Sequence, residues 1–106
     1  MKNLNFIAKD RWEELHQFFG AYFHQDWTLE ADSPDEVVRI FINDGFCRSE
    51  LMNLATDVET YADSKLNDAA AEEGLMSELG CYYLPSADNT GAKAWLCHVA
   101  TLLRSA

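Results

Sequence analysis

The sequence predicts an all-α fold, a single compact bundle of about five helices, and three observations indicate it. Apolar residues recur at spacings of three and four along most of the chain. Residues that cap helices precede these segments, and glycines follow several of them. The 106 residues, 48% of them hydrophobic, suffice for one core without disulfides or metals, so residues 1–106 are expected to form one domain.

The first helix is expected to begin at a capping box formed by Asp10 and Glu13 and to end near His24. Its apolar face carries six residues at helical spacing: Trp12, Leu15, Phe18, Phe19, Tyr22 and Phe23. Gly20 weakens such a helix by about 1 kcal/mol relative to alanine, so we expect it to admit a closely packed neighbour. This face predicts a core rich in aromatic side chains.

The second helix has the clearest start in the chain. Ser33 stands at the N-cap, Pro34 at the first helical position and Glu36 at the third. The helix is apolar nearly all round over residues 37–42, which predicts that it is buried. Gly45 follows and suits a left-handed residue that ends the helix.

The third helix is expected to start at a cap on Ser49. Its core-facing stripe has four members: Leu51, Leu54, Val58 and Tyr61. A rotation of about 100° per residue then defines an outward face and its flank. The outward face carries Met52, Thr56, Glu59 and Asp63, and the flank carries Glu50 and Asp57. Carboxylates beside an exposed methionine predict an interaction patch on this helix.

Two further helices complete the predicted bundle. Asp68 is expected to cap the fourth helix, which Gly80 ends, and Thr90 is expected to cap the fifth. Between them, Cys81–Leu84 is short, aromatic and followed by proline, which predicts one brief extended segment. Cys97 in the fifth helix has apolar neighbours, so we expect it to be a reduced thiol facing the core.

Acidic residues outnumber basic ones by 18 to 8, which gives a net charge of −10. Such a surface repels phosphate backbones, so no direct nucleic-acid binding is expected. It favours fast, salt-dependent association with basic proteins, of which nucleases are an abundant class. No apolar run approaches the roughly 20 residues of a membrane span, and the N-terminus has no apolar signal segment. We therefore expect a cytoplasmic protein without membrane contact.

Groups that could carry catalysis are few. His24 and Asp26 define the alternative hypothesis, a small hydrolase or metal-dependent nuclease, but no nucleophile or oxyanion donor can be assigned beside them. His16 and His24 are eight residues apart, beyond the spacing of four that brings two helical ligands onto one metal, and no HExxH motif occurs. We therefore expect no metal and no cofactor.

The segment from Phe18 to Trp27 places five aromatic residues, a histidine and a carboxylate in ten positions. It resembles the hallmark of the immunity proteins of bacterial contact-dependent growth inhibition systems, the CdiI family. Three further segments agree: a proline with paired valines at residues 34–38, a Gly-Cys-Tyr-Tyr-x-Pro pattern at residues 80–85, and a Trp-Leu helix at residues 94–99. The resemblance spans most of the chain, from Phe18 to Arg104.

This resemblance implies an all-helical cytoplasmic protein that binds the C-terminal toxin domain of a CdiA effector and blocks it without catalysis. Such toxins are commonly nucleases, and the acidity of this chain favours a basic ribonuclease as the cognate toxin. We expect a monomer outside a 1:1 toxin complex. The hydrolase hypothesis and an acidic adaptor for another basic protein are the alternatives.

Two surfaces are candidates for contact with the toxin. On the first, carboxylates of the third and fourth helices would occupy the cationic site that holds RNA phosphates: Asp57, Glu59, Asp63, Glu72 and Glu73. The second choice is the loop that follows the aromatic segment: Asp26, Trp27, Glu30 and Asp32. The motif residues of the family are Phe18, Phe19, Gly20, Tyr22, Phe23, His24, Asp26 and Trp27. We expect this motif to serve the fold rather than the interface, because it can bury a large apolar area.

Overall fold

Five α-helices and two 3-10 helices occur in residues 12–106, the part of the chain that the computed structural model describes. In chain order they are α1 (Glu13–Tyr22), η1 (Trp27–Leu29), α2 (Pro34–Ile42), α3 (Arg48–Ser64), α4 (Asp68–Ser77), η2 (Pro85–Asp88) and α5 (Ala92–Arg104). No strand occurs between residues 12 and 106, and residues 81–84 have no regular secondary structure. The prediction of an all-α bundle is confirmed.

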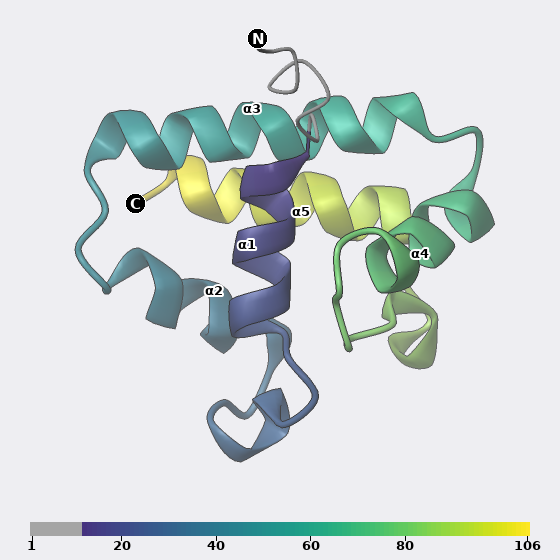
Figure 1. The fold of residues 1–106 in the computed structure, drawn as a ribbon, viewed down its shortest axis with the longest axis horizontal. Helices are drawn as coiled ribbons and strands as arrows, with labels where there is room; N and C mark the ends of the chain where they lie inside the picture. The colour runs from purple at the N-terminus through teal and green to yellow at the C-terminus, as the bar shows by residue number, and fades with distance from the viewer. Residues whose placement is uncertain (1–11) are drawn as a thin grey trace, which may run out of the picture.

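The two longest helices, α3 and α5, lie side by side and antiparallel, and α1 crosses in front of them (Figure 1). Helix α2 lies below the N-terminal half of α3, and α4 follows the other end of α3 (Figure 1). Arg48 at the start of α3 donates to the carbonyl of Ala106 at 2.9 Å, which ties this end of the pair together. No helix within residues 12–106 has both the length and the apolar character that a membrane crossing demands.

The core gathers apolar side chains from all five α-helices. The apolar stripes predicted for α1 and α3 lie in this core, with Trp12 and Tyr22 partly buried at its edge. The other eight stripe residues are buried: Leu15, Phe18, Phe19, Phe23, Leu51, Leu54, Val58 and Tyr61. Trp95 of α5 packs edge-on against Phe23, with ring centroids 5.4 Å apart, and contacts Phe19 in a tilted arrangement at 5.9 Å. Aromatic contacts therefore join α1 to α5.

Helix starts agree with the predictions at α2 but not at α3. Ser33 caps α2 through its Oγ, which accepts the N–H of Glu36 at 3.2 Å, and Pro34 is the first helical residue. Helix α3 begins at Arg48, with Cys47 rather than Ser49 at the N-cap. The reason is a capping box two residues earlier, in which the Glu50 carboxylate accepts the N–H of Cys47 at 2.9 Å. The cap predicted at residue 10 lies outside residues 12–106.

Helices α4 and α5 share one carboxylate at their starts. Asn67 rather than Asp68 caps α4, because its Oδ1 accepts an N–H of the first turn at 2.9 Å. The carboxylate of Asp68 instead accepts the N–H of Lys93 in the first turn of α5 at 3.0 Å. The N-cap of α5 is Gly91 rather than Thr90, and a Cβ at Gly91 would overlap the Asp68 carboxylate.

Gly20 of α1 has a close neighbour, as predicted, but a Cβ at Gly20 would lie 3.7 Å from the carbonyl oxygen of Leu79, an ordinary van der Waals contact. A Cβ at Gly80 would lie 3.7 Å from the Cα of Gly20, so the chain after α4 passes directly over α1. Gly80 has a φ of +68°, a left-handed conformation that glycine adopts without strain. The turn brings the N–H of Tyr82 to the carbonyl of Phe23 at 2.8 Å, just beyond the C-terminal end of α1 at Tyr22.

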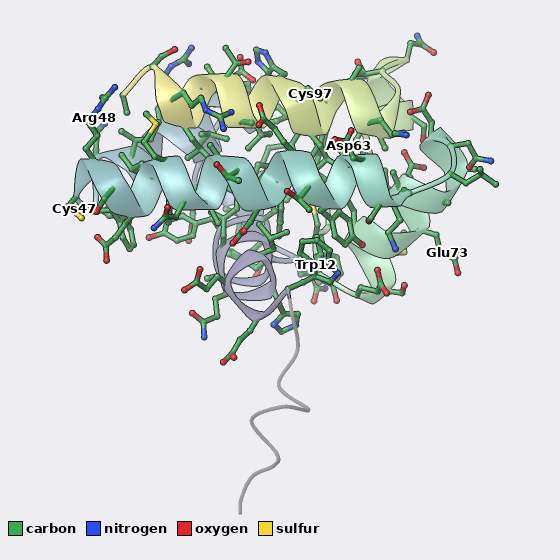
Figure 2. The ribbon with its side chains drawn as sticks, turned by 90° about the horizontal axis from the view of Figure 1, so that it is seen from above. Trp12, Cys47, Arg48, Asp63, Glu73 and Cys97 are labelled. Carbon is green, nitrogen blue, oxygen red and sulfur yellow. The ribbon has the colours of Figure 1, made fainter. Side chains whose placement is uncertain are left out.

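The prediction that Cys97 faces the core is wrong. Cys97 is exposed, whereas Trp95, Leu96 and Val99 of the same helix are buried. Two residues correspond to about 200° of rotation, so Cys97 lies on the opposite side of α5 from Trp95. Figure 2 shows Cys97 on α5, which lies alongside α3 in this view. Cys81 is buried, and this burial raises the pKa of its thiol to about 12.

Candidate partner-binding surfaces

The carboxylates expected to form one patch on α3 lie in different surroundings. Glu59 forms an ion pair with Arg104 of α5, and the same guanidinium donates to Oγ1 of Thr56 at 3.2 Å. The charge of Glu59 is therefore balanced by a cation of its own chain. Asp63 is exposed on α3, as Figure 2 shows, and it remains available to a partner.

Asp57 lies on the other flank of α3. It precedes Glu59 by two residues, which corresponds to about 200° around the helix axis. Asp57 is half-buried, and its flank also carries Glu50, seven residues and about two turns earlier. The outward face of α3 therefore separates two acidic flanks, one towards α5 and one on the side of Glu50.

The two predicted carboxylates of α4 differ in the same way. Glu72 accepts hydrogen bonds from the backbone N–H of Ser86 at 2.9 Å and from its hydroxyl at 2.8 Å, which holds η2 against α4. Glu73 is exposed, and Figure 2 shows it at the end of the molecule opposite Cys47. Within the first candidate surface, Asp63 and Glu73 are thus the two most open carboxylates.

The loop between α1 and α2, the second-choice surface, presents both charge and an apolar side chain. Asp26, Glu30 and Asp32 are exposed. Trp27 is not a displayed anchor, because its ring packs edge-on against Tyr83 with centroids 5.7 Å apart and also contacts Phe23. The exposed apolar residue of this loop is Leu29, at 82% exposure. Sequence reasoning missed it because nothing in the local pattern distinguishes it from a core leucine.

His24 holds this loop together. Its Nδ1 accepts the backbone N–H of Asp26 at 3.1 Å, so a neutral ring carries its proton on Nε2, which lies 3.1 Å from the Glu30 carboxylate. The structure therefore joins His24 to the backbone of Asp26 rather than to its carboxylate. In residues 12–106, no group of three or more His, Cys, Asp or Glu side chains is arranged to hold a metal ion.

A groove of about 390 Å³ between α1 and α3 is a third surface, which sequence reasoning missed. Its aromatic floor consists of Phe18, Tyr22, Phe41 and Phe46. Its polar rim consists of Glu14 and Gln17 on α1 and Glu50 and Asn53 on α3. Each helix contributes its two rim residues at a spacing of three, so each pair lies on one helical face. Only the packing of α1 against α3 brings the two pairs together.

The floor of this groove is a connected set of rings. Phe41 stacks on Phe46 with centroids 4.3 Å apart and lies edge-on to Phe18 at 4.6 Å and to Tyr22 at 5.0 Å. The hydroxyl of Tyr22 donates to Asp44 at 2.5 Å. Burial, with this hydrogen bond and the charge of Asp44, raises the pKa of Tyr22 to about 12. Tyr22 is therefore a neutral donor at physiological pH.

A family model described as CdiI immunity protein matches residues 11–103, nearly the whole chain. The chain belongs to the CdiI immunity protein family. This CdiI protein is therefore an immunity protein, which acts by binding the cognate toxin of a contact-dependent growth inhibition system. Searches of curated proteins and of solved structures gave no significant match.

The structure divides the aromatic motif of this CdiI protein into a core part and a loop part. Phe18, Phe19 and Phe23 are buried, which supports the expectation that the motif serves the fold. His24, Asp26 and Trp27 shape the loop after α1 through the contacts described above. Tyr22 and Phe18 of the motif also line the α1–α3 groove.

Proposed function

We propose that this CdiI protein neutralises a basic, RNA-cleaving toxin domain at the C-terminal end of a CdiA effector. The observation that carries the proposal is a net charge of −10 on a member of an immunity protein family. A ribonuclease binds RNA phosphates through cations, and carboxylates of an inhibitor can occupy the same cationic site. The protein acts as a non-enzymatic monomer in the cytoplasm and forms a 1:1 complex with the toxin.

Within the first candidate surface, the carboxylates proposed to reach the toxin are those that form no ion pair and accept no hydrogen bond among residues 12–106. These are Asp57, Asp63 and Glu73, whereas Glu59 pairs with Arg104 and both carboxylate oxygens of Glu72 accept hydrogen bonds from Ser86. A charge that is already paired adds less to a new contact, because the existing pair must be loosened or shared. Asp63 and Glu73 are therefore the positions at which to test this surface.

The test compares two double charge reversals with equal effects on net charge. Asp63→Lys with Glu73→Lys alters the first candidate surface, and Asp26→Lys with Asp32→Lys alters the loop. The partner is the purified C-terminal toxin domain of the cognate CdiA effector, with RNA cleavage and association rate as readouts. We expect the first pair to slow association and flatten its salt dependence more than the second.

The outcomes separate location from overall charge. Equal slowing by both pairs would mean that only the net charge steers the encounter. Greater slowing by the loop pair would move the interface to the α1–α2 loop, where Leu29 is exposed. If the unmodified protein leaves RNA cleavage by this toxin domain intact, the proposal of a ribonuclease inhibitor is wrong. If the protein itself cleaves RNA with a divalent metal, the non-enzymatic proposal is wrong.

A further inference from the structure

The α1–α3 groove combines an aromatic floor with carboxylates on both sides. Glu14 lies on α1 and Glu50 on α3, both exposed, and Gln17 and Asn53 add amide oxygens that can accept hydrogen bonds. Among the residues of 12–106 that line it, none is lysine, arginine or histidine. This groove differs from the α3–α5 side, where Arg104 pairs with Glu59.

Glu50, one of the two carboxylates on the rim, is held in place by a backbone hydrogen bond. The Glu50 carboxylate accepts the N–H of Cys47 through Oε1 at 2.9 Å, and this backbone hydrogen bond is the main cause that lowers the pKa of Glu50. Within residues 12–106, no cation forms an ion pair with Glu14 or Glu50. Two carboxylates therefore border an apolar surface without an ion pair to any cation of residues 12–106.

The floor is preorganised and partly open. Phe18 and Phe41 are buried at 3% and 6% exposure, and their contacts fix the ring positions. Phe46 is 39% exposed, so part of its ring remains open to a partner. The bond from Tyr22 to Asp44 holds a further wall of the groove. A side chain that enters meets rings that need no rearrangement, which limits the entropic cost of binding.

We infer that the α1–α3 groove receives one arginine side chain of the toxin, stacked on the aromatic floor and paired with Glu14 and Glu50. The inference rests on the proposed function, in which the partner is basic. A planar guanidinium stacks on aromatic rings and donates to carboxylates through a fixed fork of N–H groups. An apolar anchor would instead leave the carboxylates near its contact without compensation.

The groove is large enough to receive one long side chain. Its volume of about 390 Å³ lies near the lower end of the range of about 300–1,000 Å³ for small-molecule pockets. A buried arginine is among the residues that most often dominate the energy of an interface. The groove therefore supplies residence time, whereas the exposed carboxylates elsewhere supply the association rate.

The experiment uses isosteric charge removal with a matched control. Glu14→Gln with Glu50→Gln removes two charges from the rim, and glutamine at residue 50 can still accept the N–H of Cys47. The control, Asp63→Asn with Glu73→Gln, removes two charges outside the groove. For the same toxin domain, we expect the groove pair to weaken affinity by about tenfold or more, mainly through faster dissociation. We expect the control pair to change mainly the association rate.

A double-mutant cycle then identifies the occupant. Each arginine of the toxin domain is replaced by alanine and measured against both forms of the immunity protein. One arginine is expected to lose most of its effect when Glu14 and Glu50 are glutamines. The inference is wrong if no arginine couples to the groove, if a lysine couples instead, or if the two charge-removal pairs weaken binding equally. If the unmodified proteins do not bind one another, it is the proposed function that fails.

Phe46 provides a variant that leaves every charge in place. Phe46→Leu keeps an apolar side chain but removes the ring on which a guanidinium would stack. We expect this change to accelerate dissociation of the toxin by several-fold, while circular dichroism and the unfolding midpoint stay close to those of the parent. Unchanged dissociation with an intact fold would contradict stacking on the aromatic floor.

Discussion

The α3–α5 side and the α1–α3 groove are both acidic, but their carboxylates differ in whether they form ion pairs within the protein. On the α3–α5 side, Glu59 is matched by Arg104, a cation of the same chain. In the groove, Glu14 and Glu50 border aromatic rings, and no cation among residues 12–106 pairs with either. Net charge therefore indicates that the partner is basic. Ion pairs within the immunity protein determine which of its carboxylates are free to contact that partner.

The largest effect should come from the core that supports both regions. Phe23 is fully buried and contacts Phe18, Phe19 and Trp95. Phe23→Ala is expected to lower the free energy of unfolding by about 3–5 kcal/mol, measured by urea denaturation. Such a loss threatens the folding of a marginally stable domain. A loss below about 1 kcal/mol would show that this ring is not part of a close-packed core.

Single isosteric substitutions should separate the two acidic regions. Glu59→Gln breaks the pair with Arg104, so we expect it to lower the free energy of unfolding by about 0.2–1 kcal/mol and to leave toxin affinity within about threefold. Glu14→Gln should show the reverse pattern, with unchanged stability and weaker binding. Titration calorimetry and urea denaturation on both variants provide the measurement. If both variants change stability and toxin affinity in the same way, the proposed difference between the two acidic regions is wrong.

Alkaline pH should act on the groove through Tyr22. Its pKa is raised to about 12 in the folded protein, against an ordinary value of 10.0 for tyrosine. Between these values the unfolded chain loses a proton that the folded protein keeps, so stability is full below about pH 10 and falls as the pH rises towards 12. Denaturation curves from about pH 9 to about pH 11 should show this fall.

The variant Tyr22→Phe isolates that effect. It cannot donate to Asp44 and cannot ionise, so its stability should fall less steeply over the same pH range. Part of the fall should remain, because burial also raises the pKa of Tyr83 and of Cys81. Identical slopes for the parent and the variant would show that Tyr22 keeps its ordinary pKa.

The smallest expected effect is that of a chelator. The spacing of the histidines predicts no metal site, and the structure shows no suitable group of ligands within residues 12–106. Dialysis against EDTA is therefore expected to leave the melting temperature unchanged, as measured by differential scanning calorimetry. A large drop would point to a bound metal and would revive the hypothesis of catalysis at His24.

The sequence predicted the features that depend on local pattern. The helical stripes of α1 and α3 and the cap at Ser33 follow from spacing and residue type, and the structure confirms them. The same periodicity, applied strictly, would have placed Cys97 on the exposed side of α5. Asn67 and Asp68 are both good N-cap residues, so local preference could not tell that one caps α4 and the other reaches α5.

The features on which the proposed binding depends could not be predicted from local pattern. The rim of the groove consists of two short pairs on α1 and α3, and its floor adds Phe41 and Phe46 from further along the chain. No single segment contains the site, so only tertiary packing assembles it. The pairing of Glu59 with Arg104 joins residues 45 positions apart, and local sequence gives no sign of it.

The two layers of the groove differ in how freely they can change. Phe18 and Phe41 belong both to the floor and to the buried core, so altering them endangers folding. Glu14 and Asn53 are exposed and cap no helix, and most exposed substitutions of this kind change stability by less than about 0.5 kcal/mol. Recognition of a different toxin can thus evolve, or be engineered, by exchanging rim side chains above an unchanged aromatic base.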